Sequence, residues 1–262
     1  MRTRLLPESE AIILAGAGRA ILLQLASPAV GYGVARHSDF ASNPMGRLHG
    51  TLMYVYAVMA GTPSDRAAAS TYVTRMHGPV HGPGDGDAPA PPYDANDPGL
   101  QLWVAATLYD TAITVHDRVL GRLPEADADA AYSRYASLGS ALRMPRDLWP
   151  SDRAAFRRYW QETVETLSVD DVVRAQADAL WRATEAPLWV RSLMPLMRFL
   201  TAGLLPERVR AEYRMAWDAR SQRRFDRLWS VVVPVYAALP TVVRRWPQQY
   251  YLRRLRRLTA PR

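Results

Sequence analysis

The 262-residue chain contains no cysteine and no lysine. The first absence excludes disulfides, zinc held by thiolates, iron-sulfur clusters and a thiol nucleophile. Any metal must therefore be held by histidine, carboxylate or neutral oxygen. Because lysine is absent, arginine alone carries the net charge of +8, a pattern more typical of a GC-rich genome than of one function.

Long apolar runs are also missing. The first thirty residues are rich in apolar side chains, but Glu8, Glu10, Arg19 and Gln24 interrupt them before any run reaches membrane-spanning length. We identify neither a signal peptide nor a transmembrane helix and expect a cytoplasmic protein. With 48% hydrophobic and 22% charged residues, a chain of this length can bury a sizeable core.

No stretch alternates apolar and polar residues long enough to predict a sheet, whereas helix signals recur throughout. The sequence predicts an all-α fold, a single multi-helix globular domain. Helices are expected at 44–60 and 63–77, where Asn43 and Thr62 each precede a proline at the first helical position. The second helix ends where Gly78 and Pro79 interrupt it.

Residues 78–97 are rich in Gly, Pro and Asp and predict a long surface loop, which ends where Asp97 caps a helix over 98–120. That helix places Trp103, Thr107, Asp110 and Thr114 on one face, which is too polar for an ordinary core. Further helices are expected at 125–142, 151–167, 170–184, 188–203, 206–217 and 221–238.

The C-terminal residues 243–262 form a basic helix or tail that follows the helical domain of residues 1–242. This segment carries seven arginines and no acidic residue. Such a segment suits contact with anionic lipid or nucleic acid, although a solvated terminal helix is the more ordinary interpretation. We expect no nucleic-acid partner and leave a peripheral membrane contact open.

Arg47 and Thr51 lie four residues apart and share a helix face. A guanidinium suits a carboxylate, and a threonine hydroxyl can donate to a polar ligand atom. A salt bridge and an ordinary helix threonine explain the same two residues without a ligand. His77 ends its predicted helix and could ligate a metal as a neutral imidazole, but a structural histidine is the alternative.

Other site patterns are weaker. His77 and His81 form the chain's one HxxxH spacing, and Gly78-Pro79 breaks the helix between them, so no HExxH-type zinc site is present. GxSxG and GxxxxGK[ST] motifs are absent, and GAGRA at 16–20 resembles a dinucleotide fingerprint only loosely. In residues 37–40, and in the acidic pair at 170–171, helix or turn capping is the simpler explanation.

Four segments follow, in order, the pattern of a known family: RAILLQLASPAVGYGVARHSDFASNPMGRLHGTLMYVYAVMAGT at 19–62, VTRMHGPVHG at 73–82, PYDANDPGLQLWVAATLYDT at 92–111 and LTAGLLPERVRAEY at 200–213. Over roughly residues 11–218 the chain resembles the MpaB-type oxygenases, which include the latex-clearing rubber oxygenases. The resemblance implies an all-α fold around haem b, with the iron held by one proximal histidine.

By motif, His77 stands at the position of that proximal histidine and is the implied metal ligand. Arg47 and Thr51 match the family's distal arginine and threonine, which makes them the implied catalytic and cofactor-binding residues on the side open to dioxygen. In the rubber oxygenases a lysine precedes this threonine, whereas this chain has Gly50. A different resting coordination of the iron follows.

The helix face with Trp103 and Asp110 is expected to help wall the haem pocket. Many relatives carry a histidine at the positions of Ser27 and Ala105, so polyisoprene cleavage is not transferred to this chain. The expected function is that of a haem b-dependent oxygenase acting with dioxygen on a small apolar or isoprenoid-like substrate. Two other classes stay open: a haem carrier or sensor without turnover, and a haem-free helical protein docking on a membrane through its arginine-rich segment.

Overall fold

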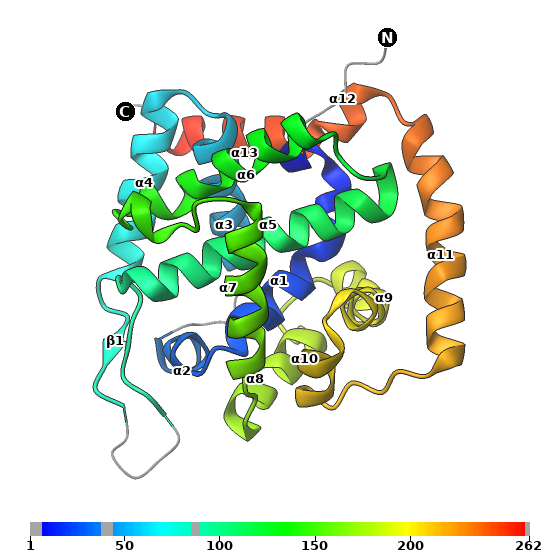
Figure 1. Ribbon diagram of the computed structural model, residues 1–262, viewed down its shortest axis with the longest axis horizontal. Helices are drawn as coiled ribbons and strands as arrows, with labels where there is room; N and C mark the ends of the chain where they lie inside the picture. The colour runs from blue at the N-terminus through cyan, green and yellow to red at the C-terminus, as the bar shows by residue number, and fades with distance from the viewer. Residues whose placement is uncertain (1–6, 38–43, 85–89, 260–262) are drawn as a thin grey trace.

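A computed structural model describes residues 7–37, 44–84 and 90–259, and nearly all of its regular structure is helical (Figure 1). The elements are η1 (Pro7–Ser9), η2 (Ala11–Gly16), α1 (Ala17–Leu25), α2 (Pro28–His37), α3 (Pro44–Ala60), α4 (Pro63–His77), β1 (His81–Gly82), β2 (Tyr93–Asp94), α5 (Pro98–Leu120), α6 (Glu125–Ser140), η3 (Arg146–Leu148), α7 (Arg153–Thr166), α8 (Asp171–Arg182), α9 (Leu188–Leu204), α10 (Glu207–Glu212), α11 (Ala219–Ala238), α12 (Thr241–Arg244) and α13 (Trp246–Thr259). The predicted single all-α domain is confirmed.

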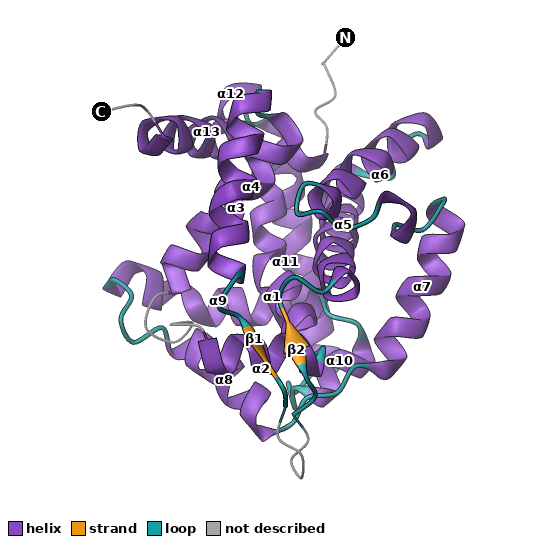
Figure 2. Cartoon of the chain, turned by 90° about the vertical axis from the view of Figure 1, so that its left-hand side faces the viewer, coloured by secondary structure: helices purple, strands orange, loops and turns teal. Residues whose placement is uncertain are grey.

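The predicted loop contains a short pair of strands. In β1 and β2, His81 pairs with Asp94 and Gly82 with Tyr93 in antiparallel register (Figure 2). Strands of two residues are too short to show the alternation by which a sheet is recognised in a sequence. Apart from this pair, the described residues of the predicted loop, 78–84 and 90–97, form neither helix nor strand.

Side chains at the helix starts explain why the predicted boundaries were close. Thr62 and Asp65 form a capping box at the start of α4, Asp97 accepts from Leu100 N at 2.9 Å, and Asp170 caps α8. The cap expected from Asn43 and the turn expected at 38–40 lie outside the described residues. The helix expected over 206–217 is shorter than predicted, because Arg214 adopts a left-handed φ of 50° just beyond α10.

The core is arranged around α5, which crosses the middle of the molecule and packs against η2, α1, α6 and α11 (Figure 1). Glycines allow the N-terminal segment to approach it closely. A Cβ on Gly16 would lie 2.5 Å from Thr111 Cγ2 in α5, and a Cβ on Gly18 only 2.1 Å from Thr201 Oγ1 in α9. The glycines of GAGRA therefore serve helix packing, in agreement with the rejection of a nucleotide site.

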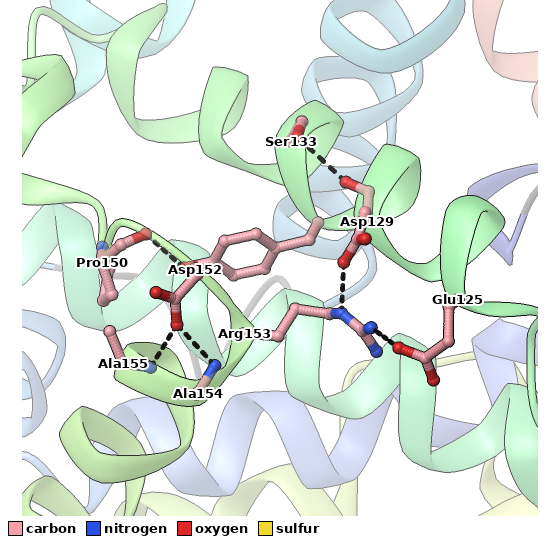
Figure 3. A network of polar contacts seen from close by, with 9 residues as sticks. Glu125, Asp129, Ser133, Pro150, Asp152, Arg153, Ala154 and Ala155 are labelled. Carbon is pink, nitrogen blue, oxygen red and sulfur yellow. Dashed lines mark hydrogen bonds and ion pairs between the residues drawn. The ribbon is translucent and has the colours of Figure 1, made fainter.

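Polar contacts join α6 to α7 on one side of the core (Figure 3). Arg153 at the start of α7 forms ion pairs with Glu125 and Asp129 of α6. The neighbouring Asp152 accepts hydrogen bonds from two backbone N–H groups of the first turn, at 2.7 and 2.8 Å. Because these groups are largely exposed, they fix the angle between the helices more than they add stability.

The basic C-terminal segment is a helix docked on the protein. α13 packs on α3 and α4 and buries Tyr251, Leu252 and Leu255. Two of the segment's arginines bind buried acids: Arg244 pairs with Glu10, and Arg256 with Asp65. These contacts are why α13 belongs to the same folded unit as the rest of the described chain.

None of the helices among the described residues is by itself long and apolar enough to cross a bilayer. Residues 11–25 and 28–37 together meet the criteria of length and composition, but they are bent by 101°. Their apolar side chains include the core residues Leu22, Leu23 and Leu25.

Candidate functional site

The helical hairpin of α3 and α4 brings Arg47 and His77 together, although they are thirty positions apart in the chain. Both residues lie about fifteen positions from the turn at Gly61, so two antiparallel helices place them at the same height. A Cβ on Gly50 of α3 would lie 3.9 Å from Tyr72 Cε1 of α4, which fixes the register of the pair. The positive charge of Arg47 lowers the pKa of the His77 imidazole.

His77 sits at the last position of α4, in front of the loop that leads into α5. Its Nδ1 is buried and has no hydrogen-bond partner among the described residues. Burial lowers the pKa of the imidazole, and the charge of Arg47 lowers it further, against smaller raising effects of the Ala95 carbonyl and the Asp94 carboxylate. The ring is therefore neutral at pH 7, which is the form that can ligate a metal.

Arg47 and Thr51 lie one turn apart near the start of α3, and both residues are exposed to solvent. The surrounding protein nevertheless desolvates the guanidinium, and this lowers the pKa of Arg47. A cation in such surroundings acts on a neighbouring charge more strongly than it would in bulk water. The pair thus offers one fixed positive charge and one hydroxyl on the helix that faces His77.

The walls around these residues are loosely packed. No described side chain is buried in residues 46–53 of α3 or in residues 70–77 of α4. In α4 the apolar side chains of Tyr72 and Met76 are 42% and 53% exposed. Exposed apolar side chains on these neighbouring helix halves are surface that an apolar group could cover.

The loop opposite His77 also borders a cleft of about 520 Å³. Its lining includes Asp94, Tyr93 and the start of α5, whereas Arg47, Thr51 and His77 are not part of it. Asp94 lines the cleft, and its carboxylate also raises the pKa of the His77 imidazole. It is therefore the residue that the cleft and the surroundings of His77 share. The sequence predicts residues 93–97 as surface loop, and the one signal for a further role is their place just before a well-capped helix.

The other histidines near the site point elsewhere. His81 is exposed in β1, and the His49 ring lies 5.7 Å from the Tyr251 ring of α13. Within the described ranges there is no group of three or more His, Asp or Glu side chains that could hold a metal ion. A metal at His77 would need most of its ligands from a cofactor, as in a porphyrin.

Trp103 and Asp110, expected to line the haem pocket, have internal partners in the structure. Trp103 is 3% exposed, donates from Nε1 to Leu23 O at 3.1 Å and stacks on Trp160. Asp110 forms an ion pair with Arg19 at 2.5 Å. The structure thus places Arg47 within electrostatic reach of His77 and Thr51 one turn further along α3, while a cofactor contact for Trp103 and Asp110 stays a prediction.

These observations define an all-α domain in which a neutral histidine lies near an arginine of the neighbouring helix. Residues 8–233 match the family model for the catalytic domain of the ER-bound oxygenase mpaB/B' and rubber oxygenases, and the chain belongs to this family. Uncharacterized proteins of Mycobacterium bovis and Mycobacterium tuberculosis are each 36% identical to it over 217 residues, which cover 81% of this chain and 84% of theirs. No solved structure matches the chain. The resemblance inferred from the motifs is confirmed, and the family is one of oxygenases.

Proposed function

We propose that the protein is a haem b-dependent oxygenase that acts with dioxygen on a small apolar, isoprenoid-like substrate. One observation carries the proposal: the buried Nδ1 of His77 lacks a partner in a chain that belongs to an oxygenase family. Buried polar atoms without partners are rare in folded proteins and call for an explanation. A cofactor beside the imidazole supplies one.

The residues present fit a haem. The neutral imidazole of His77 would hold the iron, and a porphyrin brings the remaining ring ligands itself. Arg47 would hold its guanidinium toward a carboxylate of the cofactor or toward negative charge that develops during the reaction. Thr51 would offer a hydroxyl one turn further along α3. When bound, the haem supplies the activation of dioxygen, and the protein supplies binding and orientation.

The apolar substrate is inferred from the side chains around the site. Tyr72 and Met76 present apolar surface on α4, and Leu52 and Met53 of α3 are only partly buried. Burial of such surface by an apolar molecule is favourable, at about 25 cal/mol per Å². A strongly polar substrate would find few hydrogen-bond partners there beyond Arg47 and Thr51.

The first test replaces the implied ligand. His77→Ala is expected to abolish stoichiometric haem binding, measured from the Soret absorbance of protein purified with haem supplied. His81→Ala is the matched control, because that histidine is four residues away and exposed. Circular dichroism checks that both variants fold. A full haem spectrum in folded His77→Ala protein would exclude the assignment.

A second test uses Gly50, which stands where the rubber oxygenases carry a lysine. The modest 3.9 Å approach to Tyr72 shows that a side chain fits at this position. We expect Gly50→Lys to shift the haem absorption spectrum toward that of a six-coordinate iron. The amine of the new lysine would lie on the same side of the iron as Arg47 and could bind it. Gly50→Met, of similar length but without an amine, is the control. Unchanged spectra in both variants would place α3 away from the iron.

Turnover distinguishes an oxygenase from a carrier or sensor. The oxygenase consumes dioxygen when the haem protein receives reductant and an apolar alkene, and an oxygenated product accumulates in proportion. A haem carrier binds the cofactor with the same dependence on His77 but consumes no dioxygen beyond the background given by His77→Ala protein.

We further propose that the protein works in the cytoplasm at a membrane surface, to which α13 attaches. The face of α13 that points away from the core carries Trp246, Tyr250, Arg253 and Arg257 at helical spacing, and Trp246 is 59% exposed. Aromatic and basic side chains on one helix face suit the interface of an anionic membrane. If purified protein contained no haem, this docking role would be the leading alternative.

A further inference from the structure

A second cleft lies far from His77. It has a volume of about 510 Å³ and is formed by α8, α9 and the start of α11. In Figure 1 these helices occupy the lower and right-hand parts of the molecule, whereas α4 lies at its left edge. The proposed oxygenase site does not include this cleft, so any ligand of the cleft would be additional to the substrate at His77.

The cleft contains two arginines that lack partners. Arg191 and Arg198 lie seven residues apart and thus on one face of α9, and both contribute to the lining. Neither guanidinium has an ion pair, a side-chain hydrogen bond or an aromatic ring partner within the described part of the chain. No acidic residue belongs to the lining. The positive charge in the cleft is therefore not neutralised by the protein.

The helix is interrupted between these arginines. Pro195 lies inside α9 and also lines the cleft. Because proline has no N–H, the carbonyl of Arg191 lacks its usual partner four residues later, and the ring tends to bend the helix at this point. Pro195 thus interrupts the backbone hydrogen-bond pattern of α9 at the position where the helix lines the cleft.

The remaining walls are aromatic and held in place. Trp181, Phe199 and Trp217 line the cleft, and the rings of Phe199 and Trp217 lie 5.4 Å apart. Trp217 donates from Nε1 to Gln222 at 3.0 Å, and the guanidinium of Arg210 lies 5.2 Å from its ring. A wall fixed in this way can receive an apolar group at little cost in side-chain ordering.

We propose that this cleft binds a small amphiphilic anion, with its acidic head on Arg191 and Arg198 and its apolar body against the aromatic walls. Two guanidinium groups can bind a carboxylate or a phosphate through charge-assisted hydrogen bonds. The volume is that of a site for a single small molecule. The absence of acidic side chains in the lining disfavours a cationic or zwitterionic ligand.

The test titrates the full-length protein with dodecanoate, dodecyl phosphate and dodecanol below their micellar concentrations, using calorimetry and tryptophan fluorescence. We expect one equivalent of dodecanoate or of dodecyl phosphate to bind. The anion that binds more tightly identifies the preferred head group. Dodecanol should bind at least about tenfold more weakly, since it lacks the charge that the arginines recognise.

Two variants test separately how the protein recognises the acidic head and the apolar body of the ligand. Arg191→Gln/Arg198→Gln removes both charges from exposed positions and should weaken anion binding about tenfold or more. Met194→Trp fills the cleft, which Met194 also lines, and should reduce binding with both arginines present. Arg157→Gln/Arg158→Gln, exposed on α7 and outside the lining of the cleft, is the charge-matched control and should bind as the unmodified protein does.

Three results would overturn the proposal: equal affinity for dodecanol and the anions, unchanged anion binding in the Arg191→Gln/Arg198→Gln protein, or uptake of many equivalents, as in detergent adsorption. Retained binding in His77→Ala protein would show that the ligand does not depend on the proposed haem site. The two proposals can thus fail separately.

Discussion

Arg19 and His77 differ in how completely the protein satisfies their buried polar atoms. Arg19 is 3% exposed and donates to Leu204 O, Thr111 Oγ1 and Asp110 Oδ2 at 2.5 to 2.8 Å. His77 has a buried Nδ1 without such a partner among the described residues. A satisfied buried group stabilises the fold, whereas an unsatisfied one costs stability unless a ligand completes it. Arg19 is therefore a structural residue, whereas His77 is a candidate metal ligand.

The Arg19 contacts predict a large stability effect. Arg19→Leu should lower the free energy of unfolding by about 3 kcal/mol, because it leaves Asp110 without its cation and Leu204 O without its donor. Urea unfolding followed by circular dichroism measures the change. Arg118→Leu, which breaks an exposed ion pair with Asp226, should cost less than about 1 kcal/mol. Similar losses in both variants would refute the structural role of Arg19.

At the scale of the element, α4 is fixed at its start and open at its end. Asp65 accepts from Thr62 N at 2.9 Å to complete the capping box, and it also binds Arg256 of α13 at 2.7 Å. From Ser70 onward the helix buries no described side chain. The firm start sets the position and direction of α4, so the hairpin with α3 can present His77 at a defined place while its surroundings stay open.

The start of α4 should make stability depend on pH in acid. The hydrogen bond from Arg256 is the main reason that the pKa of Asp65 falls to about 2, below its ordinary value of 3.8. A lowered pKa means that the stabilisation is present above about pH 4 and is lost as the pH falls through about 2. Because Arg256 is half exposed, we expect a contribution of about 1 kcal/mol.

Asp65→Asn should therefore be less stable than the unmodified protein at pH 7 by about this amount and equal to it near pH 2. Guanidinium unfolding at a series of pH values provides the comparison. Asp127→Asn, which changes an exposed carboxylate without an ion pair among the described residues, should alter the unfolding free energy little at any pH. A constant difference between Asp65→Asn and the unmodified protein would contradict the ion-pair explanation.

At the scale of the whole molecule, the C-terminal segment has two faces with different roles. Tyr251 stacks on Tyr56 of α3 with ring centres 5.8 Å apart, and Leu252 and Leu255 are buried beside it. Arg253 and Arg257 are exposed on the other side. One face of the segment thus completes the core, and the exposed face is available to a partner.

Removal of residues 246–262 should therefore damage the fold rather than only a membrane contact. We expect the truncated chain to unfold at a lower temperature than the full chain, because Tyr56 and its neighbours lose their cover. Arg253→Gln/Arg257→Gln should keep the unfolding temperature and lose co-sedimentation with phosphatidylserine vesicles. If the double variant sediments as the full chain does, α13 is not the membrane contact.

The helices that carry the site could be predicted closely from the sequence, and the reason is local. Thr62, Asp97 and Asp170 satisfy backbone N–H groups within a few residues of themselves, and prolines mark the same boundaries. The antiparallel hairpin of α3 and α4 also follows from two adjacent helices with a short turn. Arg47, Thr51 and His77, by contrast, stand out through their match to the family motifs and not through capping, and their roles stay predictions.

The sequence by itself determined the all-α class, the position of the hairpin and the residues of the oxygenase family motifs, because each depends on local capping or on ordered motifs along the chain. Only the tertiary structure decided that Asp94 and Ala95 face His77, that Trp103 lies in the core, and that Arg244 and Arg256 bind buried acids while Arg191 and Arg198 stay unpaired in a cleft. These contacts join residues from distant parts of the chain, and neither helix periodicity nor capping says which distant side chains will meet.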